Sequence, residues 1–486
     1  MKKIKSLLSI VLIAIVCVEM SGQINKRKPM NIIWIVAEDL SPDLNCYGNG
    51  IVKTPNLDSL AVRGMRFNNA FTVGPVCAPS RTALITGMYH TSIGSLHMRY
   101  PNKLMPELPK GIKTIAQLSK NKGYTSANIQ DYPATGKLDW MFVHDVKDNF
   151  NAFGWKELDK GKKPFFALLS LGLTHRPFVT PEKNQFDLDK IIIPPYYPDK
   201  IITRKEFASY YATIEKLDQQ VGAVLDSLRK YNLEDNTMII FTSDHGRPMT
   251  KGKYFHYDSG TKIPLIICAP ENAAKIYGYK AGSVSNQLIS SIDLAATSLS
   301  LLEIDKPDYM QGKIFLGRNK DAQREYVFSA INRISGTDFR SRSIRSHNYR
   351  YIRNYHHNFS VNSSSTYYRR SMHPIYHLLN ILNERGELTE AQKALVDEMP
   401  YEELYEITSD PYETKNLAKS PNYLDVLDGM RYELDIWIDI TSDLGLCEDN
   451  YEIKKTFADF QKKSSQDRSK KIDSLRLKVL SELDDN

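Results

Sequence analysis

The run Asn31-Ile-Ile-Trp-Ile-Val-Ala37, followed at once by Glu38-Asp39, is the stretch that says most about the fold. Its nearly unbroken apolar character and its β-branched side chains predict a strand that is buried on both faces, as in a parallel sheet. The two acids come directly after it, where open α/β sheets carry their ligand sites. The stretch therefore predicts a central strand and one side of a functional site.

The same arrangement recurs twice. Residues 163–171 form an apolar run that precedes His175, and residues 237–243 form another that precedes Asp244-His245. Helical patterns lie between the apolar runs, at 56–63, 113–122 and 205–230. This alternation of strand and helix predicts an α/β fold with a large, doubly wound, mostly parallel sheet.

The pattern changes after residue 320. Runs of β-branched and aromatic residues at 326–330 and 343–352 predict antiparallel strands. The end of the chain mixes Lys, Asp, Ser and Leu at helical spacing and predicts a solvated terminal helix. We therefore expect a large α/β domain over 30–320 and a smaller C-terminal α+β domain, built on an antiparallel sheet, over 321–486.

Residues 1–22 have the features of an export signal. Lysines precede the apolar run 7–18, which is too short to span a bilayer, and small or polar residues follow it. We expect a periplasmic or secreted protein. Lipid anchoring through Cys17 is the alternative, which the bulky Val16 before it disfavours.

Composition narrows the class of protein. The chain has 486 residues, 42% of them hydrophobic and 25% charged, which excludes a disordered, collagen-like or polytopic membrane protein. We expect no transmembrane segment. The net charge of +7 is small and dispersed, so nothing indicates nucleic acid as a partner, although an anionic substrate would not be repelled.

The chemistry is carried by residues 74–87, Gly-Pro-Val-Cys-Ala-Pro-Ser-Arg-Thr-Ala-Leu-Ile-Thr-Gly. The helical pattern places Cys77 at a helix N-terminus, where backbone N–H groups favour an anion. Cys77-X-Pro79-Ser80-Arg81 resembles the signature of the type I sulfatases, whereas a lone Cys is more often a small buried side chain. The resemblance implies an alkaline-phosphatase-like fold, hydrolysis of sulfate esters, and oxidation of Cys77 to Cα-formylglycine by a sulfatase-maturing enzyme.

The resemblance extends to the ends of the apolar runs. It implies a divalent metal, usually Ca²⁺ with Mg²⁺ as the alternative, bound by Glu38, Asp39, Asp244 and His245. Carboxylates are the hard ligands that these ions prefer. Glu38 stands where the family more often has Asp, so its metal contact is the least secure.

Catalytic roles are implied for Cys77, Arg81, Lys137, His175 and Lys253. Arg81 would brace the nucleophile, a bidentate role that Lys fills less well. Lys137 and Lys253 would bind the sulfate, and His175 would contact the leaving-group oxygen. Asp139 replaces the His of the family's Gly-Lys-X-His pattern, so it either serves as the base for sulfate release or orients Lys137.

Further residues are candidates for contacting the substrate, namely His97, Arg99, Asp139, Arg247 and His256. For all but Asp139, an ordinary position on an exposed loop is the alternative. Residues 403–407, 410–413 and 416–418 resemble the family's C-terminal motif, for which we expect a packing role.

We therefore predict an exported sulfatase that acts on sulfate esters, or on N-sulfates, of sulfated carbohydrates such as glycosaminoglycans. It resembles bacterial carbohydrate sulfatases and N-sulfoglucosamine sulfohydrolases. One alternative is a phosphatase or phosphodiesterase of the same superfamily, which would carry Ser or Thr at position 77 and bind two transition metals. The other is a glycan-binding protein with a degenerate site, which would lack Cys77, Arg81 or the lysines.

Overall fold

The computed structural model describes residues 30–100, 102–158, 163–271, 277–317, 319–334, 337–363 and 366–484. The export signal expected at residues 1–22, with Cys17, lies outside them. Among the helices of these ranges, none combines the length and the apolar character needed to cross a bilayer.

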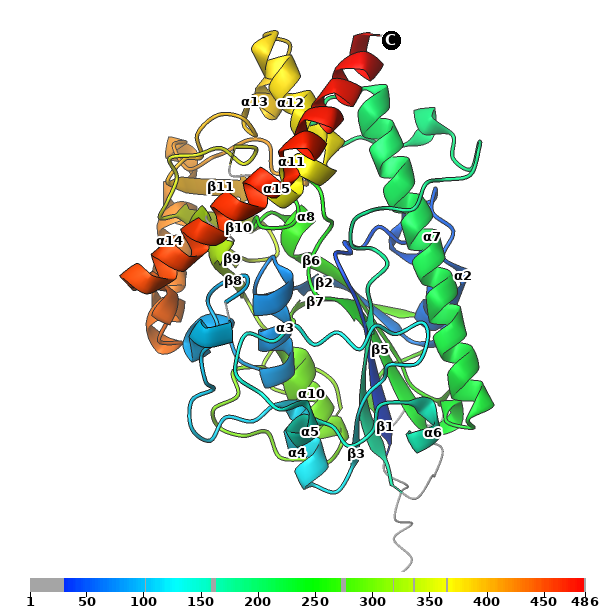
Figure 1. Ribbon diagram of the computed structural model, residues 1–486. Helices are drawn as coiled ribbons and strands as arrows, with labels where there is room; N and C mark the ends of the chain where they lie inside the picture. The colour runs from blue at the N-terminus through cyan, green and yellow to red at the C-terminus, as the bar shows by residue number, and fades with distance from the viewer. Residues whose placement is uncertain are drawn as a thin grey trace, which may run out of the picture.

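A seven-stranded sheet forms the centre of the larger part of the molecule, in the order β3-β4-β1-β5-β6-β2-β7 (Figure 1). Its middle strands, which are all buried, are β4 (Phe165–Leu171), β1 (Asn31–Ala37) and β5 (Thr237–Ser243). The flanking strands are β3 (Thr125–Asn128), β6 (Lys262–Cys268), β2 (Met65–Phe71) and β7 (Ser283–Ser290). Only β6 runs antiparallel to its neighbours, so the predicted mostly parallel sheet is confirmed.

Helices cover both faces of this sheet because alternate residues of β1 point in opposite directions. Ile33 and Ile35 pack in one apolar cluster with α2 (Pro55–Arg63) and α7 (Ile201–Lys230). Trp34 packs in a second cluster on the other face. That face is covered by α3 (Cys77–Thr86), α4 (Ile115–Asn121) and α10 (Asp293–Leu301).

A second, four-stranded antiparallel sheet has the order β11-β10-β9-β8. Its strands are β8 (Val327–Ile334), β9 (Thr337–Arg345), β10 (Tyr349–Asn354) and β11 (Glu402–Glu406). Helix α14 (Leu424–Ile440) packs on it, with Trp437 stacked on Phe328 at a centroid distance of 5.1 Å. The antiparallel sheet is confirmed, and the division between domains at residue 320 stays a prediction.

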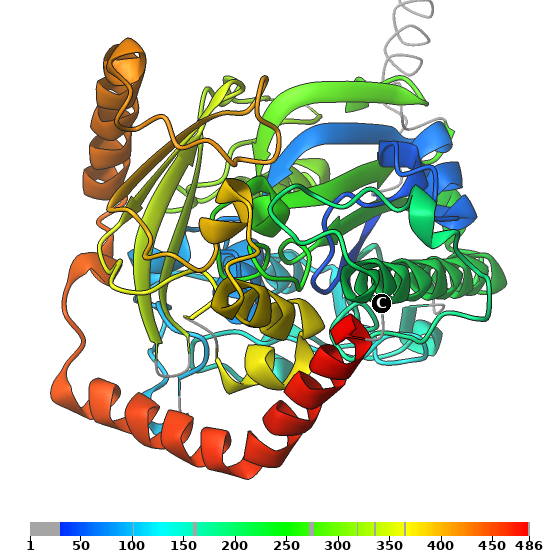
Figure 2. The same ribbon diagram turned by 90° about the horizontal axis from the view of Figure 1, so that it is seen from above.

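The remaining helices lie around these two sheets. Helix α15 (Tyr451–Asp484) runs from the second sheet to the end of α7, alongside α11 (Tyr367–Met372) and α12 (Pro374–Glu384) (Figures 1 and 2). The short helices are α5 (Val146–Asn149), α6 (Trp155–Leu158), α8 (Asp258–Thr261) and α13 (Glu390–Lys393). Helix α15 is mostly exposed, as expected of a terminal helix, but it also buries Phe457 and Val479.

The C-terminal motif contacts the loop that follows β5. Tyr257 and Tyr405 both donate hydrogen bonds to Glu403, at 2.8 and 2.6 Å. The Lys251 ammonium donates to the carbonyl oxygens of Tyr412 and Glu413, at 2.9 and 2.5 Å. These buried contacts tie the second sheet to the loop between β5 and α8.

A buried ion pair is expected to stabilise the junction between α10 and the chain that follows. Asp293, at the start of α10, accepts bonds of 2.8 and 2.6 Å from Arg324. Asp293→Ala should lower the free energy of unfolding by about 3–5 kcal/mol, since Arg324 is left buried without its partner. Denaturant unfolding measures the loss. Asp226→Ala, which breaks an exposed pair with Arg229, should cost less than about 1 kcal/mol; equal losses would contradict the assignment.

Candidate active site

The C-terminal ends of β4, β1 and β5 lie side by side, since these strands are neighbours in the sheet. Glu38 and Asp39 follow β1, Asp244 and His245 follow β5, and His175 lies on the loop after β4. The main chain holds the first two loops together, because the Asp39 N–H donates to the Asp244 carboxylate at 3.0 Å. Strand-end residues that are far apart in sequence therefore converge.

Cys77 is the first residue of α3 and faces these strand ends. Its side chain is buried, and Sγ lies 3.2 Å from His245 Nε2, 3.3 Å from Lys253 Nζ and 3.7 Å from Asp39 Oδ1. The helix N-terminus adds partial positive charge at this point. Position 77 is therefore surrounded by groups that favour an anion.

Asp39, Asp244, His245 and Cys77 each present a possible metal-ligand atom, and these atoms lie within 4.8 Å of one another. All four side chains are buried. Two carboxylates in one buried cluster are a donor set that suits Ca²⁺ or Mg²⁺. The residues present therefore fit a divalent cation.

Glu38 does not join that cluster. Its carboxylate contacts the Lys137 ammonium, and Oε1 lies 3.7 Å from a terminal nitrogen of Arg81. The structure thus brings together three of the four residues predicted to bind the metal, and it places the fourth beside two cations.

Opposite charges hold the buried cluster in its ionised form. Burial alone would raise the pKa of Asp39, but Lys253 and His245 lower that pKa well below its usual value. Burial would lower the pKa of His245, but Asp244 and Asp39 raise it to about 10. Lys253 Nζ bridges the two carboxylate oxygens of Asp39 at 2.9 and 2.8 Å. The acids are therefore charged at neutral pH.

Arg81 spans the gap between two strand ends. Its Nε donates to Asp244 at 2.9 Å, and one terminal nitrogen donates to the Ser170 hydroxyl at 3.0 Å. Ser170 in turn donates to the backbone carbonyl of Lys137 at 2.8 Å. The planar guanidinium thus links the ends of β4 and β5 beside α3, a task that a point charge could not perform.

Asp139 lies between two cations. It accepts bonds of 2.6 and 2.8 Å from Arg99, and its carboxylate lies 3.5 Å from Lys137 Nζ. Burial alone would raise the pKa of Asp139, but Arg99 and Lys137 lower it. Asp139 is therefore an ionised, doubly paired carboxylate, and this favours orientation of Lys137 over service as a base.

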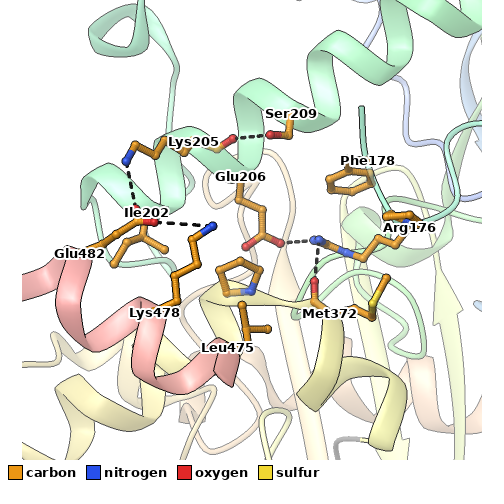
Figure 3. Close-up of a pocket in the computed structure, with 12 residues that line it drawn as sticks. Arg176, Phe178, Ile202, Lys205, Glu206, Ser209, Met372, Leu475, Lys478 and Glu482 are labelled. Carbon is orange, nitrogen blue, oxygen red and sulfur yellow. Dashed lines mark hydrogen bonds and ion pairs between the residues drawn. The ribbon is translucent and has the colours of Figure 1, made fainter. Parts of the chain in front are cut away.

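His175 is held with one ring nitrogen left for a ligand. Nδ1 lies 2.8 Å from the carbonyl oxygen of Arg176, which can only accept, so Nδ1 carries the proton. The Arg176 guanidinium is buried, pairs with Glu206 of α7 and donates to the Met372 carbonyl at 3.1 Å (Figure 3). The loop of His175 is thus anchored to α7 and α11, and the Nε2 side of the ring remains for a substrate.

A cavity of about 470 Å³ opens above Cys77, within the range of about 300–1,000 Å³ common for small-molecule sites. Its polar wall contains Arg99, His175 and Lys253. Much of the remaining lining is aromatic and comes from residues that no sequence motif singled out, namely Tyr100, Tyr254, Tyr367, Tyr368, Phe457 and Phe460. No motif marks these aromatic residues, since they come from separate loops and from α11 and α15.

Besides Asp139, three candidate substrate residues do not line the cavity. His97 is buried with Nε2 2.9 Å from Asp449. Arg247 pairs with Asp43 at 2.9 Å. His256 is buried between the hydroxyls of Ser329 and Ser341, at 2.7 and 3.0 Å. His97 and His256 are thus buried and Arg247 is half-buried, because each side chain has a polar partner inside the protein.

Comparison with known proteins decides the family. The sequence profile of the sulfatase family matches residues 30–304. The chain belongs to the sulfatase family. An ulvan-active sulfatase of Formosa agariphila is 32% identical to this sulfatase over 464 residues, which covers 85% of this chain and 75% of the relative.

Two further proteins resemble this sulfatase over most of its length. Human N-sulphoglucosamine sulphohydrolase is 26% identical over 477 residues, which covers 87% of this chain and 92% of the human protein. The solved structure of a 2-O GAG sulfatase superposes with a TM-score of 0.61 at 20% identity, covering 86% of this chain and 93% of that one. The family resemblance, the alkaline-phosphatase-like fold and the enzyme class, a sulfuric ester hydrolase, are thereby confirmed.

Arg99 is expected to support turnover through Asp139. Arg99→Ala should reduce kcat/KM for a sulfated saccharide about tenfold or more, because Asp139 loses two charge-assisted hydrogen bonds and Lys137 loses its fixed position. Release of free sulfate measures the effect. Arg229→Ala, at an exposed position of α7, is the control and should leave kcat/KM unchanged. An unchanged value for Arg99→Ala as well would contradict the role of Arg99 in turnover.

Proposed function

We propose that this sulfatase removes sulfate from sulfated carbohydrates, either O-sulfate esters or N-sulfates. The observation that carries the proposal is the buried Cys77, with Lys253 and His245 within 3.3 Å of Sγ, in a cavity that polar and aromatic side chains line together. The ulvan-active and N-sulphoglucosamine-cleaving relatives support the substrate class. The glycan-binding alternative is disfavoured, because Cys77, Arg81 and the lysines are all present.

We also propose where the reaction takes place. Residues 1–22 would direct export to the periplasm or the exterior, where sulfated polysaccharides are met. Residues 30–320 would form the catalytic domain and residues 321–486 the smaller C-terminal domain. During biosynthesis a sulfatase-maturing enzyme would act on Cys77, so the partners are that enzyme and the carbohydrate, with no nucleic acid.

Residue 77 is the proposed nucleophile. As Cα-formylglycine, it would supply in its hydrated form the hydroxyl group that attacks sulfur. The chain prepares this position with the N-terminus of α3, with Lys253 and with His245. These groups favour the charge that develops on the attacking oxygen.

Asp39, Asp244 and His245 are the proposed ligands of Ca²⁺, with Mg²⁺ as the alternative; His245 would bind in its neutral form, with the ion in place of a ring proton. The ion would supply positive charge beside the sulfuryl oxygens. We leave Glu38 out of this set because it contacts Lys137 and Arg81. Glu38 would instead keep these cations in place.

The sulfate group is proposed to lie between Lys137 and Lys253. Their ammonium groups would neutralise the sulfuryl oxygens as the bond to the leaving oxygen lengthens. In its imidazolium form, with the Nδ1 proton held by the Arg176 carbonyl, His175 would donate its second proton from Nε2 to that oxygen. Arg81 would position Asp244 and the start of α3 without moving a proton.

Phosphoryl transfer is the second reading that the fold permits. Phosphatases and phosphodiesterases of this superfamily would carry Ser or Thr at position 77 and hold two transition metals. This chain has Cys77 and, among its described residues, one cluster of possible metal ligands near it. Both observations favour the sulfate ester.

The modification of Cys77 can be tested directly. In protein made together with a sulfatase-maturing enzyme, the peptide that contains Cys77 should show the mass of an aldehyde in place of the thiol. The protein should release sulfate from sulfated saccharides of ulvan or glycosaminoglycans, and Cys77→Ala should abolish the release. An unmodified Cys77, together with turnover of phosphate esters only, would favour the phosphatase reading.

Metal binding should be visible in stability as well as in activity. After removal of metal by a chelator, Ca²⁺ should raise the thermal midpoint, since a ligand at one hundred times its Kd stabilises by about 2.7 kcal/mol. Asp244→Asn should lose this response. Parallel titration with Mg²⁺ distinguishes the two ions. A wild-type protein that responds to neither ion would refute the metal site.

A further inference from the structure

The C-terminal helix forms part of the catalytic cavity. Thr456, Phe457 and Phe460 of α15 line the same cavity as Cys77 and Lys253. Phe457 is 3% exposed, but Phe460 is 51% exposed. Burying a Phe side chain is favourable, so exposure of Phe460 lowers the stability of the free protein. Phe460 is thus an apolar surface presented to the cavity without full cover from the protein.

Phe460 belongs to a group of aromatic rings that line the cavity. Its ring lies 6.3 Å from that of Tyr367 on α11, at an interplanar angle of 65°. The Tyr100 and Phe457 rings lie 6.5 Å apart at 64°. Edge-to-face pairs at such distances are favourable, so the rings support one another in a defined arrangement.

The start of α15 is fixed beside the cavity by buried polar contacts. Asp449, just before the helix, lies 2.9 Å from His97 Nε2 and accepts a bond of 2.9 Å from Arg333 Nε. His97 and Phe457 stack edge to face, with centroids 5.5 Å apart. His97 thus acts as a positioning residue for α15, which gives a physical reason for its burial.

The far end of α15 is fixed to α7. Glu482 pairs with Lys205 of α7 at 3.0 Å, and Leu475 lines the same pocket as the buried pair of Arg176 and Glu206 (Figure 3). A helix held at both ends can present a side chain in a constant place. The position of Phe460 is therefore set by the fold rather than by the helix alone.

We propose that Phe460 and Tyr367 form an aromatic platform for the sugar ring that carries the scissile sulfate. The inference rests on the proposed function and deepens it. A pyranose ring has an apolar face of C–H groups, which would pack against the exposed ring of Phe460, while its sulfate would point to Cys77 and Lys253, which line the same cavity. The C-terminal helix thereby contributes to the choice of sugar.

Phe460→Ala tests the platform. We expect KM for a sulfated disaccharide to rise about tenfold with kcat within about twofold, because the lost contact holds the ring and not the reacting atoms. Phe460→Trp should keep KM within about twofold of wild type. Inhibition by inorganic sulfate, which occupies only the polar side, should be unchanged in both variants.

Leu477→Ala is the matched control, since Leu477 is 66% exposed on the same helix and does not line the cavity. Its KM should equal that of wild type. An unchanged KM in Phe460→Ala, or an equal rise in the inhibition constant for sulfate, would overturn the platform alone. A wild-type enzyme that releases no sulfate from any sulfated saccharide would overturn the proposed function and this inference with it.

Discussion

The buried carboxylate of Asp39 constrains the whole structure. A charge removed from water is tolerated only when opposite charge and hydrogen bonds surround it, and Lys253 and His245 supply them. Lys253 lies on the loop after β5, so this loop must fold back over the ends of β1 and β5. The position of Cys77 follows, because its Sγ lies against the same three side chains.

The second half of the chain is needed to hold that loop. Arg369 of α11 is buried and donates to the carbonyl oxygen of Lys253 at 3.0 Å. Its guanidinium also lies over the rings of Tyr254 and Phe255, each at 5.2 Å. Burial lowers the pKa of Arg369 to about 10, which still leaves it charged at neutral pH. Lys253 and the acids around it are thus held in place by a residue that lies beyond the segment 30–304 matched by the family profile.

The sequence predicted what depends on short, regular patterns. Three apolar runs gave the central strands, and the residues after them gave most of the site, because parallel strands end together. The direction of a single side chain was harder to predict. Glu38 and Asp39 are consecutive, but the chain bends after β1 and Asp39 has a φ of 50°, so their side chains reach different partners and only Asp39 joins the cluster with Cys77. His97 and His256 were misplaced because their partners, Asp449, Ser329 and Ser341, are remote in sequence.

The polar and the aromatic residues that line the cavity differ in how well they tolerate substitution. The charged side chains of the site are paired with one another. Replacing one of them leaves its partner as an unpaired buried charge and disturbs the other pairs. The aromatic side chains are held by apolar packing. They can be replaced by apolar side chains of similar size at a modest cost in stability. The charged residues that would carry out the reaction can therefore be substituted only together. The residues of α11 and α15 that we propose to contact the sugar can be substituted one at a time. This division explains why the motif around Cys77 predicted the chemistry but not the substrate.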